Sequence, residues 1–343
     1  MGITLKELAA ALELSPTTVS RALNGYPEVS EATRQRVQLA ARKAGYQPNT
    51  RAKSLATGRA HAIGHVIPLS TSHEIVNPIF ADFIAGAGES YSRAGYEMVL
   101  SVVADDAEED AYRSLIARGT VDGLMVHGPR RGDPRIALLD ELGCPFLVHG
   151  RTSEVTSPYS WLDINNKRAF QRATEFLIEL GHRRIALING LEAMDFAIRR
   201  RAGYETAMQA AGLALDPALI RAAEMTEPFG YRAAQEMMRL PDPPTAFLAS
   251  SMLVAYGLRR GLVDLGLTLG RDVSVITHDD DLSYLPNGGD VPLFTATRSS
   301  VREAGRKAAD MLLELVTGRA TPPLSCLMEA ALVVGSSTGR ARG

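Results

Sequence analysis

Apolar residues recur with two different periods along the chain, and the change of period divides it. Up to residue 60 they return every three or four positions, the spacing of one face of an α-helix. From residue 61 on, short and nearly continuous apolar runs alternate with longer amphipathic stretches. Such runs indicate buried strands, and the stretches between them indicate helices. The pattern therefore predicts an all-helical domain at 1–60 and an α/β body at 61–343.

Three short helices are predicted in the first sixty residues. Thr4 and Glu7 have the T-x-x-E spacing of a capping box before the first helix. Ser15 is a good N-cap for the second, and Pro16 follows it at the first helical position, where a missing N–H costs nothing. Ser30 opens the third helix. Only two residues separate the first two helices, a connection typical of a helix-turn-helix unit.

The second of these helices has two unlike faces. Val19, Ala22 and Leu23 can pack in a core. The opposite face is short, polar and basic, with Pro16, Thr17, Ser20 and Arg21. A face of this kind can enter the major groove of DNA and bind base edges. A solvated amphipathic helix in a small bundle is the alternative interpretation.

The body is predicted to form parallel sheets covered by helices on both faces. The expected strands are 62–69, 97–103, 121–127, 145–149, 184–189, 245–249 and 273–277. The expected helices include 80–93, 108–117, 168–180 and 254–265. A single large sheet is possible, but two doubly wound lobes suit this length better. Such sheets bind ligands beyond the carboxyl ends of their strands, which predicts a pocket between the lobes.

Charge supports this division of the chain. The formal net charge is −2 over 343 residues, which alone argues against a nucleic-acid binder. Residues 1–60, however, hold nine Lys and Arg and four acidic residues, a balance of +5, which leaves −7 for the rest. A basic head on an acidic body indicates a nucleic-acid module joined to another function.

Composition excludes several other classes of protein. The two cysteines, Cys144 and Cys326, lie among apolar residues and are expected to be buried thiols, without a disulfide or metal spacing. No apolar run has the length of a signal-peptide core or of a membrane span. We therefore expect a cytoplasmic protein without cofactor. The carboxylates after His278 alternate in direction along a strand and are not expected to converge on a metal.

A resemblance to a known family emerges from the first sixty residues. The pieces TLKELA, TVSRALNG, VSEATRQRV, AGYQPN and A-x-S-L follow one another without a gap, and together resemble the headpiece of the lac/gal repressor (LacI/GalR) family. The resemblance implies that Pro16, Thr17 and Arg21 contact bases. It also implies that phosphates are held mainly by Thr18, Ser20, Asn24, Ser30 and Thr33. Further DNA contacts are expected at Thr4, Ser15, Asn49, Arg51 and Lys53.

The segment 50–56 is polar and too short to be a stable helix alone. The resemblance implies that it folds on DNA as a hinge helix. Leu55 would then wedge into the minor groove, unstacking a base step in exchange for a bend. The alternative is that Leu55 packs under the next domain.

The resemblance continues through the body. NPIFADFIAG, DGLMVHG, PFLVHGR, GHRRIALING, RRRAGYETAM and VSVITHDD resemble the periplasmic-binding-protein type I-like core of these repressors. It implies a homodimer on operator DNA and two lobes, one of residues 61–161 and 291–322, the other of residues 162–290 and 323–343. It also implies an effector, expected to be a sugar or sugar phosphate, between the lobes.

Candidate effector residues follow from the same alignment of motifs. Arg200 begins the family's R-x-x-G-aromatic motif, and a guanidinium there can bind two hydroxyls in a fork. Asp279 holds the position of a pocket aspartate. Apolar walls are expected from Ile79, Phe80, Phe196 and Met225, and Arg151, Asp195 and Ser251 are further candidates.

Two departures limit what the family implies about the effector. Ser251-Met252 stand where the family usually has Asn-Asp, and Thr277-His278 precede Asp279 in place of Gly-aromatic. The pattern SSM…HDDD is similar to that of members responding to α-glucosides. Any single Arg or Asp of the body is also well explained as part of an ion pair between elements.

Two other functions stay open for the body. Paired carboxylates such as Asp163 and Asp279 could serve a sugar-cleaving enzyme. The sequence has no phosphate-binding loop and no nucleophile elbow, and the headpiece argues against an enzyme. Alternatively, the body could respond to a protein partner. The sequence leaves open the operator, the effector, the sign of regulation and any assembly beyond a dimer.

Overall fold

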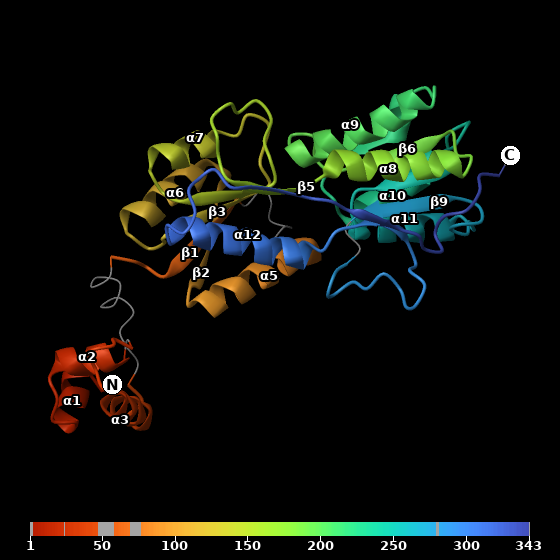
Figure 1. Ribbon diagram of the computed structural model, residues 1–343. Helices are drawn as coiled ribbons and strands as arrows, with labels where there is room; N and C mark the ends of the chain where they lie inside the picture. The colour runs from red at the N-terminus through yellow and green to blue at the C-terminus, as the bar shows by residue number, and fades with distance from the viewer. Residues whose placement is uncertain (1–2, 24, 47–57, 69–76, 279–280, 343) are drawn as a thin grey trace. The chain divides into compact units, whose positions relative to one another are not determined.

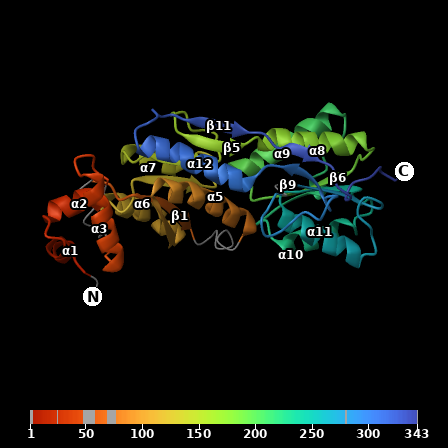
Figure 2. The ribbon, with the colours of Figure 1, turned by 60° about the horizontal axis from the view of Figure 1, so that its bottom comes forward.

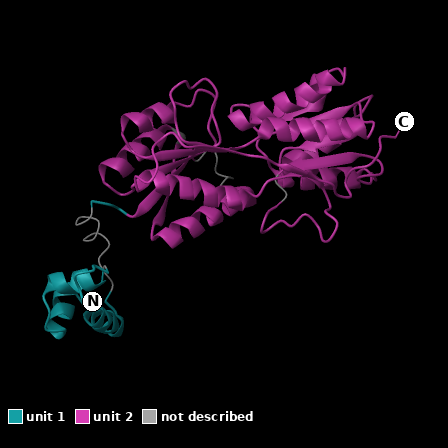
Figure 3. Cartoon of the chain, viewed as in Figure 1, with its two compact units in different colours: residues 1–60 teal, residues 61–343 magenta. Residues whose placement is uncertain are grey.

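The structure is a computed structural model that describes residues 3–23, 25–46, 58–68, 77–278 and 281–342. The chain separates into two compact units, residues 1–60 and 61–343 (Figure 3). Each unit has its own hydrophobic core and is described separately below.

The first unit consists of the three predicted helices, α1 (Leu5–Ala11), α2 (Pro16–Leu23) and α3 (Glu31–Lys43). The capping box at the start of α1 is complete, because Thr4 accepts from the backbone N–H of Glu7 and the Glu7 carboxylate accepts from that of Thr4. Val19 of α2 is fully buried between α1 and α3 residues of the same core. The predicted helix-turn-helix architecture is thus confirmed.

The second unit contains two six-stranded, mainly parallel sheets. The first has the order β11-β5-β4-β3-β1-β2, and the second has the order β12-β10-β9-β8-β6-β7. The strands of the first sheet are β1 (Ala62–Pro68), β2 (Glu97–Val103), β3 (Gly123–His127), β4 (Phe146–His149), β5 (Trp161–Ile164) and β11 (Ser325–Met328). Those of the second are β6 (Ile185–Asn189), β7 (Ile220–Ala222), β8 (Ala246–Ala249), β9 (Ser274–His278), β10 (Thr295–Arg298) and β12 (Ala331–Val333). Among the strands of the described residues, β12 alone pairs antiparallel, with β10.

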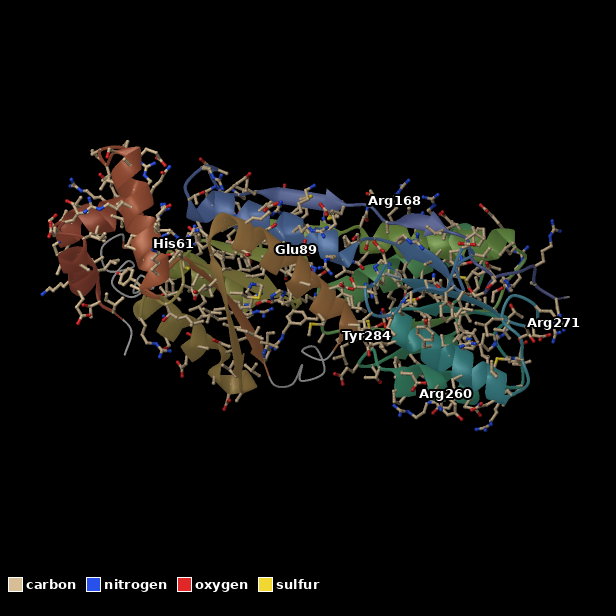
Figure 4. The ribbon with its side chains drawn as sticks, turned by 90° about the horizontal axis from the view of Figure 1, so that it is seen from below. His61, Glu89, Arg168, Arg260, Arg271 and Tyr284 are labelled. Carbon is tan, nitrogen blue, oxygen red and sulfur yellow. The ribbon has the colours of Figure 1, made fainter. Side chains whose placement is uncertain are left out.

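Helices cover both sheets. They are α5 (Pro78–Ala94), α6 (Glu108–Ala117), α7 (Pro134–Glu141), α8 (Asn166–Glu179), α9 (Asp195–Ala210), α10 (Glu227–Met237), α11 (Met252–Asp264) and α12 (Val301–Val316), with short 3-10 turns at Asp105–Ala107 and Pro217–Leu219. Figures 1 and 2 show α5 beside α12 against the first sheet, and α10 beside α11 against the second. Glu89 on α5, labelled in Figure 4, pairs there with Arg302 and Arg306 of α12.

Sheet pairing corrects the expected lobe boundaries in three places. Residues 162–164 pair in the first sheet as part of β5, and β11 pairs beside them although 323–343 were expected in the other lobe. Residues 295–298 form β10 in the second sheet although 291–322 were expected in the first lobe. The chain thus crosses between the sheets after β5, after β10 and after β11. The expected boundaries were wrong because each short strand at a crossover belongs to the sheet in which it finds its pairing partner, and the sequence does not show that partner.

Glycines allow three pairs of helices to pack with their backbones in close approach. A Cβ on Gly86 of α5 would lie 2.0 Å from the carbonyl oxygen of Arg302 on α12, and one on Gly305 would lie 2.2 Å from that of Phe83. Gly203 of α9 and Gly257 of α11 meet backbone of α8 and α10 in the same way. Two of these pairs, α5 with α12 and α8 with α9, contribute residues to the cavity described below.

A methyl group at Gly86 should therefore be costly. We expect Gly86→Ala to lower the free energy of unfolding by about 1–3 kcal/mol or more, because α5 and α12 must move apart. Gly88 is the matched control on the same helix, since a Cβ there meets only the Met98 methyl at 3.9 Å. Gly88→Ala should be neutral or stabilise by up to about 1 kcal/mol through helix propensity. Urea unfolding of both variants tests this, and equal stability would contradict the packing argument.

Candidate functional site

The exposed face of α2 presents the side chains expected to contact bases. Pro16, Thr17 and Arg21 are exposed, whereas Val19 and Ala22 are fully buried. The helix therefore separates a packing face from a polar, basic face, as the sequence pattern predicts. Short side chains around one arginine leave the backbone of such a helix free to approach a groove closely.

Other predicted DNA contacts lie at helix N-termini. Ser15 caps α2 by accepting from the Thr18 N–H at 3.0 Å, and Ser30 caps α3 by accepting from the Thr33 N–H at 3.3 Å. Their hydroxyls, like that of Thr4, are exposed at the positive ends of helix dipoles, where phosphates bind well. Ser20 is half-buried on α2. The remaining predicted contacts, Asn24, Asn49, Arg51, Lys53 and Leu55, lie outside the described residues.

Two arginines of α3 stabilise the first unit internally. Arg36 donates to the carbonyl of Leu12 at the end of α1. Arg34 pairs with Glu31 and donates to the carbonyls of Tyr26 and Val29. Both side chains therefore fix the arrangement of the helices that presents α2.

A cavity of about 160 Å³ lies between the two sheets of the second unit, where strands β3, β4, β5 and β9 end. Six residues predicted to contact an effector line it: Ile79, Phe80, Arg151, Phe196, Arg200 and Met225. Further lining comes from Asn77, Phe83, His127, His149, Asp163, Asn166, Ser250, His278, Val301 and neighbouring backbone. The structure thus brings together residues from α5, α9 and several strand ends, far apart in the sequence.

Two predicted effector residues do not line this cavity. Asp195, at the start of α9, accepts from the backbone N–H and the hydroxyl of Ser153 and pairs with Arg199 at 3.1 Å. Ser251 is fully buried and caps α11 through the Val254 N–H. The Asp195 side chain joins α9 to the loop after β4, and the Ser251 side chain caps its own helix, which corrects the expectation that they face the effector. Asp279 lies outside the described residues.

The lobe built on the first sheet is called the first lobe below, and the lobe built on the second sheet is called the second lobe. Arg200 organises the second lobe's side of the cavity. Its guanidinium donates to Asn166 Oδ1 at 2.7 Å and to the Ser250 carbonyl at 2.8 Å. It also lies over the ring of Phe196, 4.7 Å from the centroid. Only 6% of Arg200 is exposed, so three segments of the second lobe are fixed around one cation.

Arg151 and Asp163 form an ion pair on the first lobe's side. Arg151 Nε lies 2.8 Å from Asp163 Oδ2, and the guanidinium stacks over Trp161. Burial raises the pKa of the Asp163 carboxyl above its usual value, although the hydrogen bond from Arg151 opposes this shift. Asp163 was singled out from the sequence only as half of an enzyme's carboxylate pair, and its place in the cavity wall was not predicted.

Three histidines in the wall were also missed. His127, His149 and His278 are the last residues of β3, β4 and β9. His149 stacks on Phe83 with ring centroids 3.9 Å apart, and His127 Nε2 lies 2.9 Å from His65 Nδ1. Burial lowers the pKa of His149 to about 4 and that of His65 to about 3, and it holds the pKa of His127 well below the usual value. The sequence did offer a signal for these positions, because each histidine is a polar residue at the end of an apolar run.

The buried pair His65 and His127 predicts a loss of stability in acid. In the unfolded chain both titrate near pH 6.5, whereas the folded chain resists protonation of either at that pH. Below pH 6.5 the unfolded state therefore binds more protons, so the free energy of unfolding falls as pH falls, by about 1.4 kcal/mol per pH unit per histidine.

From pH 7.5 to 5.5 we expect these two groups to remove about 3 kcal/mol from the free energy of unfolding. Urea unfolding at the two pH values measures the loss. A His65→Phe, His127→Leu double variant should show a smaller loss than the unsubstituted chain. An equal loss in both proteins would contradict this origin.

No group of metal-ligating side chains occurs among the described residues, which include His278 and Asp281 but not Asp279 and Asp280. Cys144 and Cys326 are unpaired and half-buried, less enclosed than expected, and burial raises the pKa of the Cys144 thiol to about 11. No helix in the described part of the chain is both long and apolar enough to cross a membrane.

Comparison with known proteins decides the family. Residues 4–49 match the bacterial regulatory proteins of the lacI family, and residues 174–338 match the periplasmic binding protein-like domain. The chain is 45% identical over 343 residues to the HTH-type transcriptional regulator AglR of Rhizobium meliloti (strain 1021), covering 99% of this chain and 96% of that one. The chain belongs to the LacI family. The HTH-type transcriptional regulator RafR of Escherichia coli is 35% identical, with 98% of each chain covered.

Solved structures of LacI-family members share the whole architecture. A complex of the transcriptional regulator CelR with cellobiose is 32% identical, with a TM-score of 0.72 over 98% of this chain and 99% of that one. The lac repressor dimer bound to operator and the anti-inducer ONPF is 26% identical, with a TM-score of 0.83 over 99% and 100% of the chains. These relatives are named as regulators, so the family assignment removes the sugar-cleaving enzyme that the body alone left open.

Proposed function

We propose that this LacI-family protein is a repressor whose affinity for operator DNA is controlled by a sugar bound in the cavity between the two sheets. One observation carries the proposal: a single chain presents the polar face of α2 and a cavity walled by Arg200, Phe196 and Phe80. Aromatic rings beside a guanidinium suit a sugar, because a pyranose has apolar C–H faces and hydroxyls at its edge. The protein acts in the cytoplasm, where DNA is found.

A homodimer binds a near-palindromic operator in this account, because one short helix contacts too few bases for specificity. The lac repressor was solved as a dimer bound to operator, which supports this assembly. The segment 50–56 lies outside the described residues, and we expect it to add the hinge contact that the family resemblance implies, with Leu55 in the minor groove.

Two buried carboxylates join the lobes and can transmit the state of the cavity. Asp195 on α9 binds Ser153 of the loop after β4. Asp82 on α5 accepts from the Ser283 N–H at 2.7 Å, in the loop after β9. A sugar that contacts both lobes shifts them toward one arrangement in proportion to its differential affinity for the two. A coupling of about 1–3 kcal/mol suffices for roughly 5- to 150-fold regulation.

We expect the effector to be a disaccharide, with α-glucosides the first class to test because of the SSM…HDDD pattern. The complex of CelR with cellobiose supports a disaccharide. A thermal-shift screen of maltose, trehalose, sucrose, raffinose and cellobiose, followed by calorimetry, tests the effector class. The contradicting result is that no sugar stabilises the chain, whereas a protein partner does so and alters DNA binding. The effector would then be a protein, and the assignment as a DNA-binding regulator would still hold.

A further inference from the structure

We infer that the cavity selects unphosphorylated sugars over sugar phosphates, and that His127 contacts a hydroxyl of the bound sugar. This inference rests on the proposed function, because it assumes that the effector occupies the cavity. It narrows the ligand class and assigns a contact residue that the sequence did not predict.

The helix N-termini around the cavity already have anionic or polar partners of their own. Phosphates in proteins are commonly bound by the unpaired N–H groups at such ends. Here side chains cap three helices that contribute cavity residues: Asn77 for α5, Asn165 for α8 and Ser300 for α12. At α9 the first helical residue is Asp195, a buried carboxylate. A phosphate would have to displace these caps or lie beside that carboxylate.

Arg151 and Arg200, the two cations among the described lining residues, also have partners within the protein. Arg151 is paired with Asp163, and Arg200 donates to Asn166 and to the carbonyl of Ser250. A phosphate dianion would compete with Asp163 for Arg151, and the displaced carboxylate would remain buried. Burying an ion without a partner costs several kcal/mol, so the arrangement disfavours a second anion.

Beside the ion pair of Arg151 and Asp163, the first lobe also presents an uncharged polar group to the cavity. His127 is 7% exposed, and its ring lies against Phe80, Phe83 and His149 in the cavity wall. Its Nε2 is bonded to His65, whereas its Nδ1 is buried and has no hydrogen-bond partner among the described residues. Such an atom is expected to find its partner in a ligand or in water.

A hydroxyl is the group that suits His127 Nδ1 best. The bond between His65 Nδ1 and His127 Nε2 can form with either imidazole as the donor, which leaves His127 Nδ1 as an N–H donor or as an acceptor. A hydroxyl donates and accepts, so it satisfies both tautomers, whereas a phosphate dianion can only accept. The aromatic rings around His127 provide apolar contacts for the C–H groups of the sugar.

Calorimetry of the full chain with matched sugars tests the selectivity. The pairs are maltose and maltose 6′-phosphate, trehalose and trehalose 6-phosphate, and cellobiose and cellobiose 6-phosphate. For whichever sugar binds, we expect the phosphorylated form to bind at least about 100-fold more weakly, because the cations in the described part of the wall are already paired within the protein. Equal or tighter binding of a phosphorylated form would overturn the inference and leave a sugar-controlled regulator intact. Binding of no sugar in either form would overturn the proposed function as well.

Variants at His127 test the contact. His127→Leu should weaken binding of the unphosphorylated sugar by about 10-fold or more, because it leaves a buried hydroxyl unpaired. His127→Asn keeps a donor and an acceptor near the position of Nδ1 and should retain affinity within about fivefold. The two variants therefore separate a ligand contact from a packing role.

His61→Asn is the matched control. His61, labelled in Figure 4, is the residue before β1 and does not line the cavity. Its φ of 53° is a conformation that asparagine tolerates. We expect sugar binding by this variant to equal that of the unsubstituted chain. If His127→Leu remains folded by thermal unfolding and binds the sugar normally, or if His127→Asn loses as much affinity as His127→Leu, His127 is not the contact.

Discussion

Arg21→Ala should abolish selective binding to operator DNA while leaving non-specific binding nearly intact. Arg21 lies on the exposed face of α2, beside Pro16 and Thr17, which offer no charge to a base. A bidentate contact from arginine to a guanine contributes about 1–3 kcal/mol of discrimination, so two subunits of a dimer would lose about 2–6 kcal/mol. Val19 and Ala22 hold α2 from the opposite face, so the substitution should not unfold the first unit.

Fluorescence anisotropy with operator and with random DNA, at several salt concentrations, separates the two kinds of contact. Lys53→Ala provides the comparison, because losing a phosphate contact, which is what we expect of Lys53, weakens all DNA binding and flattens its salt dependence. If Arg21→Ala weakens operator and random DNA equally, Arg21 contacts phosphate and the specificity lies elsewhere on α2.

Arg200→Ala should remove the response to sugar without affecting DNA binding in its absence. The substitution deletes the donor to Asn166 and to the Ser250 carbonyl and the stacking on Phe196, all in the cavity wall. Truncating a buried, hydrogen-bonded charge costs about 2–5 kcal/mol. We therefore expect the affinity for the sugar to fall by about 30-fold or more.

Arg201→Ala is the matched control for Arg200→Ala. Arg201 is the next residue on α9, but it pairs with Glu192 and Glu205 and is absent from the cavity wall. Its removal should leave sugar affinity unchanged. Calorimetry and operator binding with both variants decide the matter: normal sugar binding and a normal response by Arg200→Ala would place the effector site outside this cavity.

Sequence periodicity predicted the elements whose patterns are long or regular. The helices of the first unit carry caps at Thr4, Ser15 and Ser30. Strands such as β1 and β3 are buried along their whole length and are apolar except for one histidine each. Local chemistry determines these elements. The crossover strands β10 and β11 have only four residues each, and exposed and covered positions alternate along β11. Their sheet is set by partners distant in sequence, which explains the misplaced lobe boundaries.

The candidate site was also predictable only in part, because its residues come together from segments that are distant in the sequence. Family resemblance pointed to Arg200, Phe196 and Phe80, which the fold brings to one cavity. It also pointed to Asp195, which bonds to Ser153 of another segment, and to Ser251, which caps its own helix. The histidines at the ends of β3 and β4 were visible as polar residues closing apolar runs, but only the parallel arrangement of those strands shows that they converge.

The most direct test of sugar-controlled DNA binding is the affinity for an operator, selected in vitro from random DNA, with and without the sugar found by calorimetry. We predict a near-palindromic site bound by a dimer, and a change of about 5- to 150-fold in its dissociation constant at saturating sugar. The change should disappear in Arg200→Ala and persist in Arg201→Ala. An operator affinity that stays the same with and without a sugar proved to bind would contradict the account.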